Sequence, residues 1–128
     1  MKHKMIFILP FFYFAYSNAQ VDRNLTRGNK YFEIAYYSEA IPFYKTSLDN
    51  RYTYEALKNI ADSYYFILNY DKALMYYKYL VKHHSTSLDE TTYFRYSETL
   101  KTKNKYLEAN NMLREYYKRN DVTKLANL

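Results

Sequence analysis

Large apolar side chains recur three or four residues apart along most of the chain after residue 20. In the middle of the sequence Leu57, Ile60, Ala61 and Tyr64 follow one another at spacings of three, one and three residues. Residues at these spacings share one face of an α-helix, so the pattern predicts amphipathic helices that each bury a single stripe. Polar residues separate these segments. Helices are expected at 22–35, 37–49, 53–67, 70–83, 89–103 and 106–119, which makes the predicted fold class all-α.

A short phrase of the form Tyr-x-[Glu/Lys]-Ala opens the second helix of each successive pair. It begins at Tyr37, Tyr70 and Tyr106, so its copies are 33 and 36 residues apart. Comparing the flanking sequence at the same offsets extends the match to further small and large residues. The matching positions are Gly28, Tyr31, Tyr37, Ala40 and Tyr44, then Ala61, Tyr64, Tyr70, Ala73 and Tyr77, then Ser97, Tyr106, Ala109 and Leu113.

This spacing matches the tetratricopeptide pattern, in which each repeat of about 34 residues forms a helical hairpin. Small residues let the two helices approach closely, and large residues three or four positions away fill the space around them. A single hairpin cannot bury its apolar stripe, so neighbours must stack. The sequence therefore predicts a right-handed α-solenoid of three hairpins, at about 22–52, 53–86 and 89–120. Pro42 falls early in a second helix, where we expect a distorted first turn.

Residues 1–19 have the layout of a secretory signal peptide. Lys2 and Lys4 give a positive start, an uncharged apolar run follows, and Ala19 ends a group of small residues at the expected cut. An uncleaved membrane anchor is the competing interpretation, but a span needs about 20 apolar residues. We therefore expect an exported protein, periplasmic or associated with the outer membrane. Residues 121–128 are too short for another hairpin and are expected to start a capping helix or a linker to a missing domain.

Composition excludes some classes of partner. The chain has no cysteine, so an exported form must be held together by packing rather than by disulfides. Its net charge of +6 becomes +4 once Lys2 and Lys4 leave with the signal peptide, and the remaining cations are scattered. Nucleic-acid binding needs a concentrated basic stripe, so no nucleic-acid partner is predicted.

The sequence also lacks the residue patterns that carry catalysis, since it has no Ser/His/Asp set, no Gly-rich phosphate loop and no metal motif. We therefore predict a non-enzymatic protein without a metal or a small-molecule cofactor. His83 and His84 are adjacent, so on a helix they point about 100° apart, and no further His or Cys ligand stands nearby. They are expected at a helix C-terminus, where positive charge is favourable.

The first helices of stacked hairpins line the concave face of a solenoid, and this face is the predicted partner-binding groove. Its residues in the repeat register are Asn29, Phe32, Glu33, Lys58, Asp62, Tyr65, Phe66, Phe94, Glu98 and Lys101. The four aromatic residues of this set either line the groove for a peptide or partner helix, or pack between adjacent hairpins.

Some tetratricopeptide domains hold the C-terminal carboxylate of a peptide with five polar residues. Asn29, Asn59 and Arg95 stand at three of the matching positions. Leu25 and Thr91 replace the two lysines, and losing two cations removes most of the charge-assisted attraction. This mode of binding is therefore rejected.

Four segments of the chain are similar to a known family: SNAQ, NKYFEIAYYSEAIPFYKTSL, ALKNIADSYYFILNYDKALMYYKYLV and TYFRYSETLKTKNKYLEANNML. They resemble the exported N-terminal tetratricopeptide region of large OmpA-family envelope proteins of Bacteroidetes-type bacteria. Members of that family continue into a β-propeller, a small β-sandwich and a C-terminal peptidoglycan-binding OmpA-like domain, and some act with the type IX secretion machinery. None of these downstream parts is present in the given sequence.

The resemblance implies a location in the cell envelope and a role as a scaffold, with an envelope protein or peptide as partner. An association with peptidoglycan would depend on the missing domains. Two alternatives remain open at this point. The repeats are either a structural spacer that holds a downstream domain at a set distance, or a glycan-binding module that uses the aromatic residues of the groove.

Overall fold

The computed structural model describes residues 21–120, and the predictions made for residues 1–19 and 121–128 lie outside this part. Helices account for 81% of the described residues and no strand occurs among them, which confirms the all-α class. Each helix ends within two residues of the predicted boundaries. The helices are α1 (Arg23–Glu33), α2 (Tyr37–Asn50), α3 (Tyr54–Phe66), α4 (Tyr70–His84), α5 (Glu90–Thr102) and α6 (Tyr106–Asn120).

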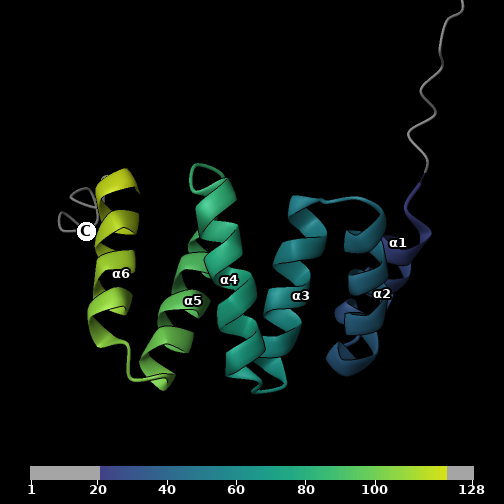
Figure 1. The fold of residues 1–128 in the computed structure, drawn as a ribbon, viewed down its shortest axis with the longest axis horizontal. Coiled ribbons are helices and arrows are strands. Elements are labelled where there is room, and N and C mark those ends of the chain that lie inside the picture. Colours follow the sequence, from purple (N-terminus) through teal and green to yellow (C-terminus); the bar gives the residue numbers. More distant parts are fainter. Residues whose placement is uncertain (1–20, 121–128) are drawn as a thin grey trace, which may run out of the picture.

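The three helical hairpins stand side by side in one row, in chain order (Figure 1). They pair as hairpins α1–α2, α3–α4 and α5–α6, and the hairpins pack on one another through α2 against α3 and α4 against α5. The first helices also contact each other, α1 with α3 and α3 with α5. This packing of helical hairpins is consistent with a solenoid. It brings the odd-numbered helices, which carry all ten predicted groove residues, into one continuous surface.

Each hairpin turns through the same backbone motif at the end of its first helix. The residue after the C-cap has a left-handed φ near 60° in all three turns, at Ala35, Leu68 and Asn104. The amide of the next residue donates to the carbonyl five positions back in the Schellman pattern. These bonds are Tyr36 to Tyr31, Asn69 to Tyr64 and Lys105 to Leu100, at 2.8 to 2.9 Å. None of the three left-handed residues is glycine, so each turn bears some of the strain that glycine would relieve.

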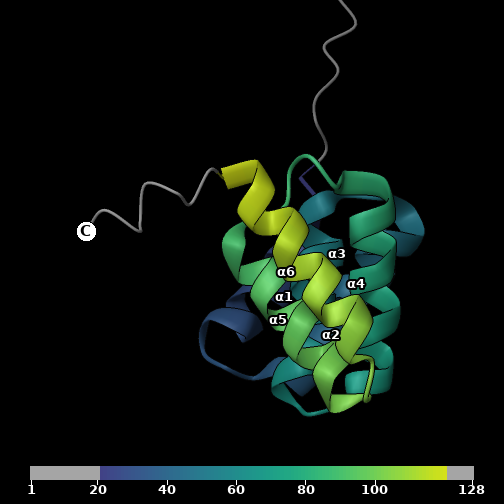
Figure 2. The ribbon, with the colours of Figure 1, turned by 90° about the vertical axis from the view of Figure 1, so that its left-hand side faces the viewer.

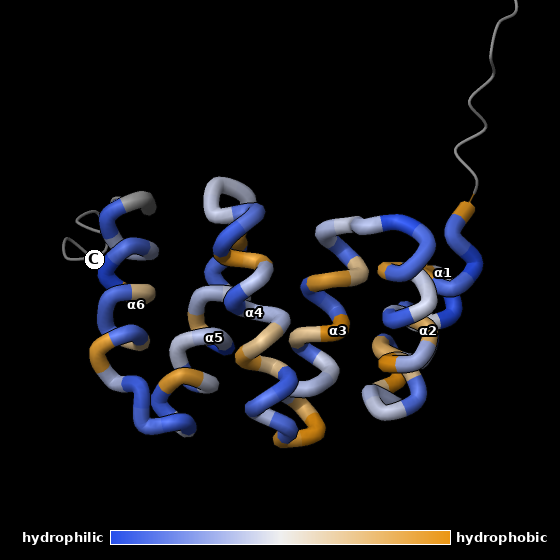
Figure 3. Tube along the Cα trace, in the orientation of Figure 1, coloured by the Kyte–Doolittle hydropathy of each residue, from blue (hydrophilic) through white to orange (hydrophobic). Residues whose placement is uncertain are grey.

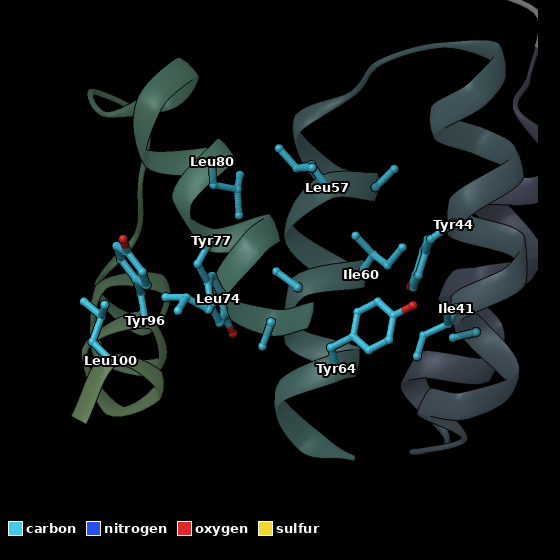
Figure 4. Packing of buried hydrophobic residues seen from close by; sticks show 14 of the residues in the cluster. Ile41, Tyr44, Leu57, Ile60, Tyr64, Leu74, Tyr77, Leu80, Tyr96 and Leu100 are labelled. Atoms are coloured by element: carbon cyan, nitrogen blue, oxygen red, sulfur yellow. The ribbon is translucent and has the colours of Figure 1, made fainter. Parts of the chain in front are cut away.

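The core is a single cluster that runs between the layers of helices (Figure 4). The alanine of each repeated phrase, at Ala40, Ala73 and Ala109, has no exposed surface. Hydrophilic residues alternate with apolar ones along the helices, as expected for helices with one buried face (Figure 3). Pro42 lies in the second turn of α2, and that helix continues through it to Asn50.

Gly28, the only glycine of the chain, lies inside α1 directly against the ring of Tyr44 in α2. A Cβ atom added there would sit 2.7 Å from Cε1 of Tyr44. The Tyr44 ring cannot easily retreat, because it is fully buried and its hydroxyl donates to Asn29 Oδ1 at 2.9 Å. Glycine at this position therefore permits the close approach of the two helices, in spite of its low helix propensity.

Gly28→Ala is expected to lower the free energy of unfolding by about 1 kcal/mol. Overpacking a tight contact costs about 1–3 kcal/mol, which exceeds the gain of up to about 1 kcal/mol in helix propensity. Urea denaturation followed by circular dichroism measures the difference. Ala61→Gly is the matched control, because Ala61 occupies the same register in α3 and its methyl group is fully buried. A more stable Gly28→Ala variant would show that the ring of Tyr44 yields.

Candidate functional site

The predicted groove residues all lie on α1, α3 and α5, and we call this set the first-helix surface. Its polar members are organised by a contact that repeats between hairpins. In the first hairpin Asn29 Oδ1 accepts from the Tyr44 hydroxyl at 2.9 Å and from Asn59 Nδ2 of the next hairpin at 3.0 Å. Asn29 Nδ2 in turn donates to Glu55 Oε1 at 2.7 Å. Asn29 thus joins its own hairpin to the next one.

Asp62 occupies the same register in the second hairpin and repeats the contact with a full charge. Its side chain has no exposed surface. It accepts from the Tyr77 hydroxyl at 2.6 Å, from Arg95 of the third hairpin at 2.6 Å and from Lys58 at 3.1 Å. Burial, reinforced by the negative charge of Asp62, raises the pKa of Tyr77 well above its ordinary value, so the hydroxyl stays protonated and donates. Asp62 therefore holds two hairpins together and offers no surface to a partner.

The third hairpin keeps the acceptor but changes its surroundings. Glu98 stands in the register of Asn29 and Asp62, whereas Leu113 replaces the tyrosine that donates to them. Glu98 accepts from Lys101 of its own helix at 2.9 Å, and both side chains are about 40% exposed. The series of acceptors consequently ends in an accessible carboxylate.

The two junctions between hairpins differ in their chemistry. The first has no ion pair among the described residues and is made by amides and rings, with Asn29 bonded to Asn59 and to the Glu55 carboxylate and Phe32 edge-on to Phe66. The second relies on charged groups. Its ion pairs join Arg95 to Asp62 at 2.6 Å, Lys58 to Asp89 at 3.8 Å and Lys103 to Asp71 at 2.6 Å. Fewer residues of α4 and α5 meet than of α2 and α3.

The four aromatic residues of the first-helix surface divide into two groups. Phe66 stacks on Tyr37 with ring centroids 4.5 Å apart and meets Phe32 at 6.2 Å, both from the first hairpin. The guanidinium of Arg95 lies 4.6 Å from the Phe66 ring, so one side chain contacts all three hairpins. Tyr65 is half-buried beside Phe66. Of the two interpretations left open by the sequence, packing between hairpins describes Phe32 and Phe66.

Phe94 belongs to the second group, because 56% of its surface is exposed. It shares one face of α5 with Glu98 and Lys101, at spacings of four and three residues. We call these three residues the α5 patch. Burial raises the pKa of the neighbouring Tyr65 hydroxyl, and the charge of Glu98 adds to this shift. The α5 patch is the part of the first-helix surface where an aromatic ring and both signs of charge are open to a partner.

The remaining members of the predicted set are placed less centrally. Glu33 is exposed at the last residue of α1, and Lys58 is largely covered by its contacts with Asp62 and Asp89. Asn59 and Arg95, two of the three positions that match a carboxylate clamp, bond to Asn29 and Asp62 within the fold. Each of these two side chains therefore already bonds to a neighbouring hairpin.

Sequence reasoning missed a cavity that is lined mainly by second helices. A space of about 460 Å³ lies between α2, α3 and α4, and Lys45 and Asp49 stand at its polar edge. Its apolar and aromatic lining consists of Leu48, Tyr52, Leu57, Met75, Tyr76 and Tyr79. Burial and the neighbouring Tyr79 raise the pKa of the Tyr52 hydroxyl to about 12. These residues come from three different elements, so no local pattern in the sequence announces the cavity.

His83 and His84 lie in the last turn of α4 and pack against tyrosines. His84 stacks on Tyr52 with centroids 5.8 Å apart, and His83 meets Tyr79 at 4.2 Å. Within residues 21–120 no group of three His, Cys, Asp or Glu side chains could hold a metal ion. In the same part of the chain, every helix is too short or too polar to cross a bilayer. No protein-family model matches this chain, and no curated protein is significantly similar to it.

Proposed function

We propose that this chain is a non-enzymatic scaffold of the tetratricopeptide type that is exported to the cell envelope and binds another envelope protein. The right-handed solenoid, the export signal and the OmpA-family relationship are part of this proposal. Support comes from the repetition itself. Three hairpins share one turn motif, and the same acceptor on their first helices links the first to the second and the second to the third. Such arrays place their first helices on an extended surface that other proteins use for binding.

The exposed ring of Phe94 is the observation that carries the proposal. Most polar groups around it are occupied by contacts inside the fold, and Phe32 and Phe66 are packed between hairpins. Phe94 has no comparable ring contact among the described residues and leaves more than half of its surface open. An exposed aromatic residue flanked by Glu98 and Lys101 fits an extended or helical peptide that places an apolar side chain on the ring and opposite charges beside it.

Phe94→Glu is expected to reduce partner recovery about tenfold, because burying a new carboxylate in an interface costs at least about 1.4 kcal/mol. The measurement is a quantitative pull-down from envelope extracts with the purified full chain as bait. Met75→Glu is the matched control, since Met75 is a similarly exposed apolar residue that lies on α4, at the cavity between α2, α3 and α4. Equal urea midpoints for both variants verify that the bait stays folded.

Equal recovery by Phe94→Glu and wild type would show that the α5 patch is not the binding surface. Recovery of no protein by the wild-type chain would favour the spacer instead. In that case the gene beyond codon 128 should encode the domain that the repeats hold in place. A glycan-binding module would instead give a saturable change in tyrosine fluorescence on addition of cell-wall fragments.

A further inference from the structure

The second helix of each hairpin presents the same stripe of four positions to the hairpin that follows. The stripe is Tyr37, Ile41, Tyr44 and Leu48 in α2, Tyr70, Leu74, Tyr77 and Val81 in α4, and Tyr106, Asn110, Leu113 and Tyr117 in α6. In α2 and α4 these side chains are buried or half-buried. Figure 4 shows the reason, since Tyr44 lies beside Ile60 of α3 and Tyr77 beside Tyr96 of α5.

The stripe of α6 has no such cover within the described residues. Tyr106 is 58% exposed and Tyr117 is 53% exposed, whereas their counterparts in α2 and α4 are half-buried or better. Figure 2 views the row from this end, with α6 toward the viewer. A helix placed here would lie beside α6 and α5 together, just as α3 lies beside α2 and α1.

The series of acceptors points to the chemistry of such a helix. Asn29 accepts from Asn59 on the first helix of the following hairpin, and Asp62 accepts from Arg95 on the next one. Glu98 is the third acceptor of this series, and its side chain is 38% exposed. A following helix in the same register would bring a donor to Glu98. Arginine suits a carboxylate best, because its fork can bind while Lys101 keeps its own contact.

We propose that the notch formed by the α6 stripe and Glu98 binds an amphipathic helix of another protein, whose apolar side covers Tyr106, Leu113 and Tyr117 while an arginine pairs with Glu98. The model for this pairing is the junction between the second and third hairpins, where Arg95 of one hairpin pairs with Asp62 of the other. The inference shares Glu98 with the proposed function but does not rest on it, since the helix is held by the α6 stripe and not by Phe94.

A second copy of this chain is a poor occupant of the notch. The residues of α3 that cover α2 are Leu57, Ile60 and Tyr64, all apolar or aromatic and buried. The same register of α1 holds Asn24, Arg27 and Tyr31. The donor position of Asn59 and Arg95 corresponds to Thr26, whose side chain is too short to replace an arginine. The first helix of a second copy would therefore set a polar face on an apolar stripe.

The test uses a synthetic peptide with the sequence of residues 88–104, because α5 is the helix that fills the same notch on α4. Fluorescence anisotropy of the labelled peptide with the full chain is expected to show saturable binding with a Kd below about 1 mM. Replacing the arginine of the peptide (Arg95→Ala) should weaken binding about tenfold, as expected for loss of a charge-assisted bond. Tyr117→Glu in the full chain should weaken it by a similar factor, while Glu98→Gln should abolish the difference between the two peptides.

Several results would overturn the inference. Absence of binding, or equal binding of the wild-type and Arg95→Ala peptides, would show that an arginine does not pair with Glu98. Peptide binding that is unchanged by Tyr117→Glu would show that the α6 stripe is not the binding surface. A dimer in analytical ultracentrifugation that Tyr117→Glu dissociates would assign the stripe to a second copy. If the peptide bound only to a full chain that carries Leu125→Asp, the α6 stripe would be assigned to residues 121–128 of the same chain. The pull-down with Phe94→Glu is read separately, so failure of one idea leaves the other measurable.

Discussion

Asp62→Ala is expected to lower the free energy of unfolding by about 3 kcal/mol. The substitution leaves the buried Tyr77 hydroxyl without its acceptor and takes the countercharge from Arg95 and Lys58. Breaking a buried ion pair by removing one partner costs about 3–5 kcal/mol, and the lower end applies because both cations are about 20% exposed. Urea denaturation of the purified full chain, followed by circular dichroism, gives the value.

Asn29→Ala is the matched control for this experiment. It removes the same acceptor from the first hairpin, where the donors are the neutral Tyr44 and Asn59, together with one exposed bond to Glu55, and is expected to cost about 1 kcal/mol. Asp62→Asn should fall between the two, because the amide oxygen still accepts from Tyr77 while the charge is lost. If Asp62→Ala cost no more than Asn29→Ala, the charge at the second junction would contribute nothing beyond an ordinary hydrogen bond.

Phe66→Ala is expected to cost about 2 kcal/mol of stability, less than the 3–5 kcal/mol of a fully buried phenylalanine because Phe66 is half-buried. The truncation removes the stack on Tyr37, the edge contact with Phe32 and the cation–π contact with the Arg95 guanidinium. These contacts come from both neighbouring hairpins, so the loss affects both junctions.

Phe94→Ala is the comparison that isolates this effect. Phe94 is also a phenylalanine of the first-helix surface, but it is mostly exposed. Its truncation should therefore change the free energy of unfolding by less than about 0.5 kcal/mol. Thermal denaturation of the two variants side by side separates the roles. Equal destabilisation would mean that Phe66 contributes no more to the junctions than a surface residue. The same pair shows why Phe94 and not Phe66 is the proper probe of partner binding.

The helices and their pairing were predictable because the signals are local. The spacing of apolar residues fixes which face is buried, and the recurring Tyr-x-[Glu/Lys]-Ala phrase marks where each second helix starts. Asn69 and Asn104 lie in turns between helices, so the boundaries agree with the structure to within two residues. None of these inferences required a contact between distant residues.

The roles of individual surface residues were not predictable in this way. Asp62 and Glu98 occupy the same register, but Asp62 is buried under Tyr77 of its own hairpin and Arg95 of the next one, whereas Glu98 pairs with Lys101 and stays accessible. Phe66 and Phe94 were indistinguishable as aromatic residues on first helices. Their difference arises from Phe32 and Tyr37, which belong to another hairpin and pack on one of them. Such distinctions depend on neighbours that are some 30 residues away in the sequence.

The unequal chemistry of the two junctions gives the row a preferred place to bend. Dissolved salt screens the exposed ion pairs Lys58–Asp89 and Lys103–Asp71 of the second junction, but it scarcely affects the buried Asp62 or the amide and ring contacts between the first two hairpins. Rising ionic strength would therefore loosen the last hairpin while the other two stay locked as a block. Phe94 and Glu98 lie on that last hairpin. The orientation of these two residues relative to the first two hairpins, and so toward a bound protein, would therefore change with ionic strength.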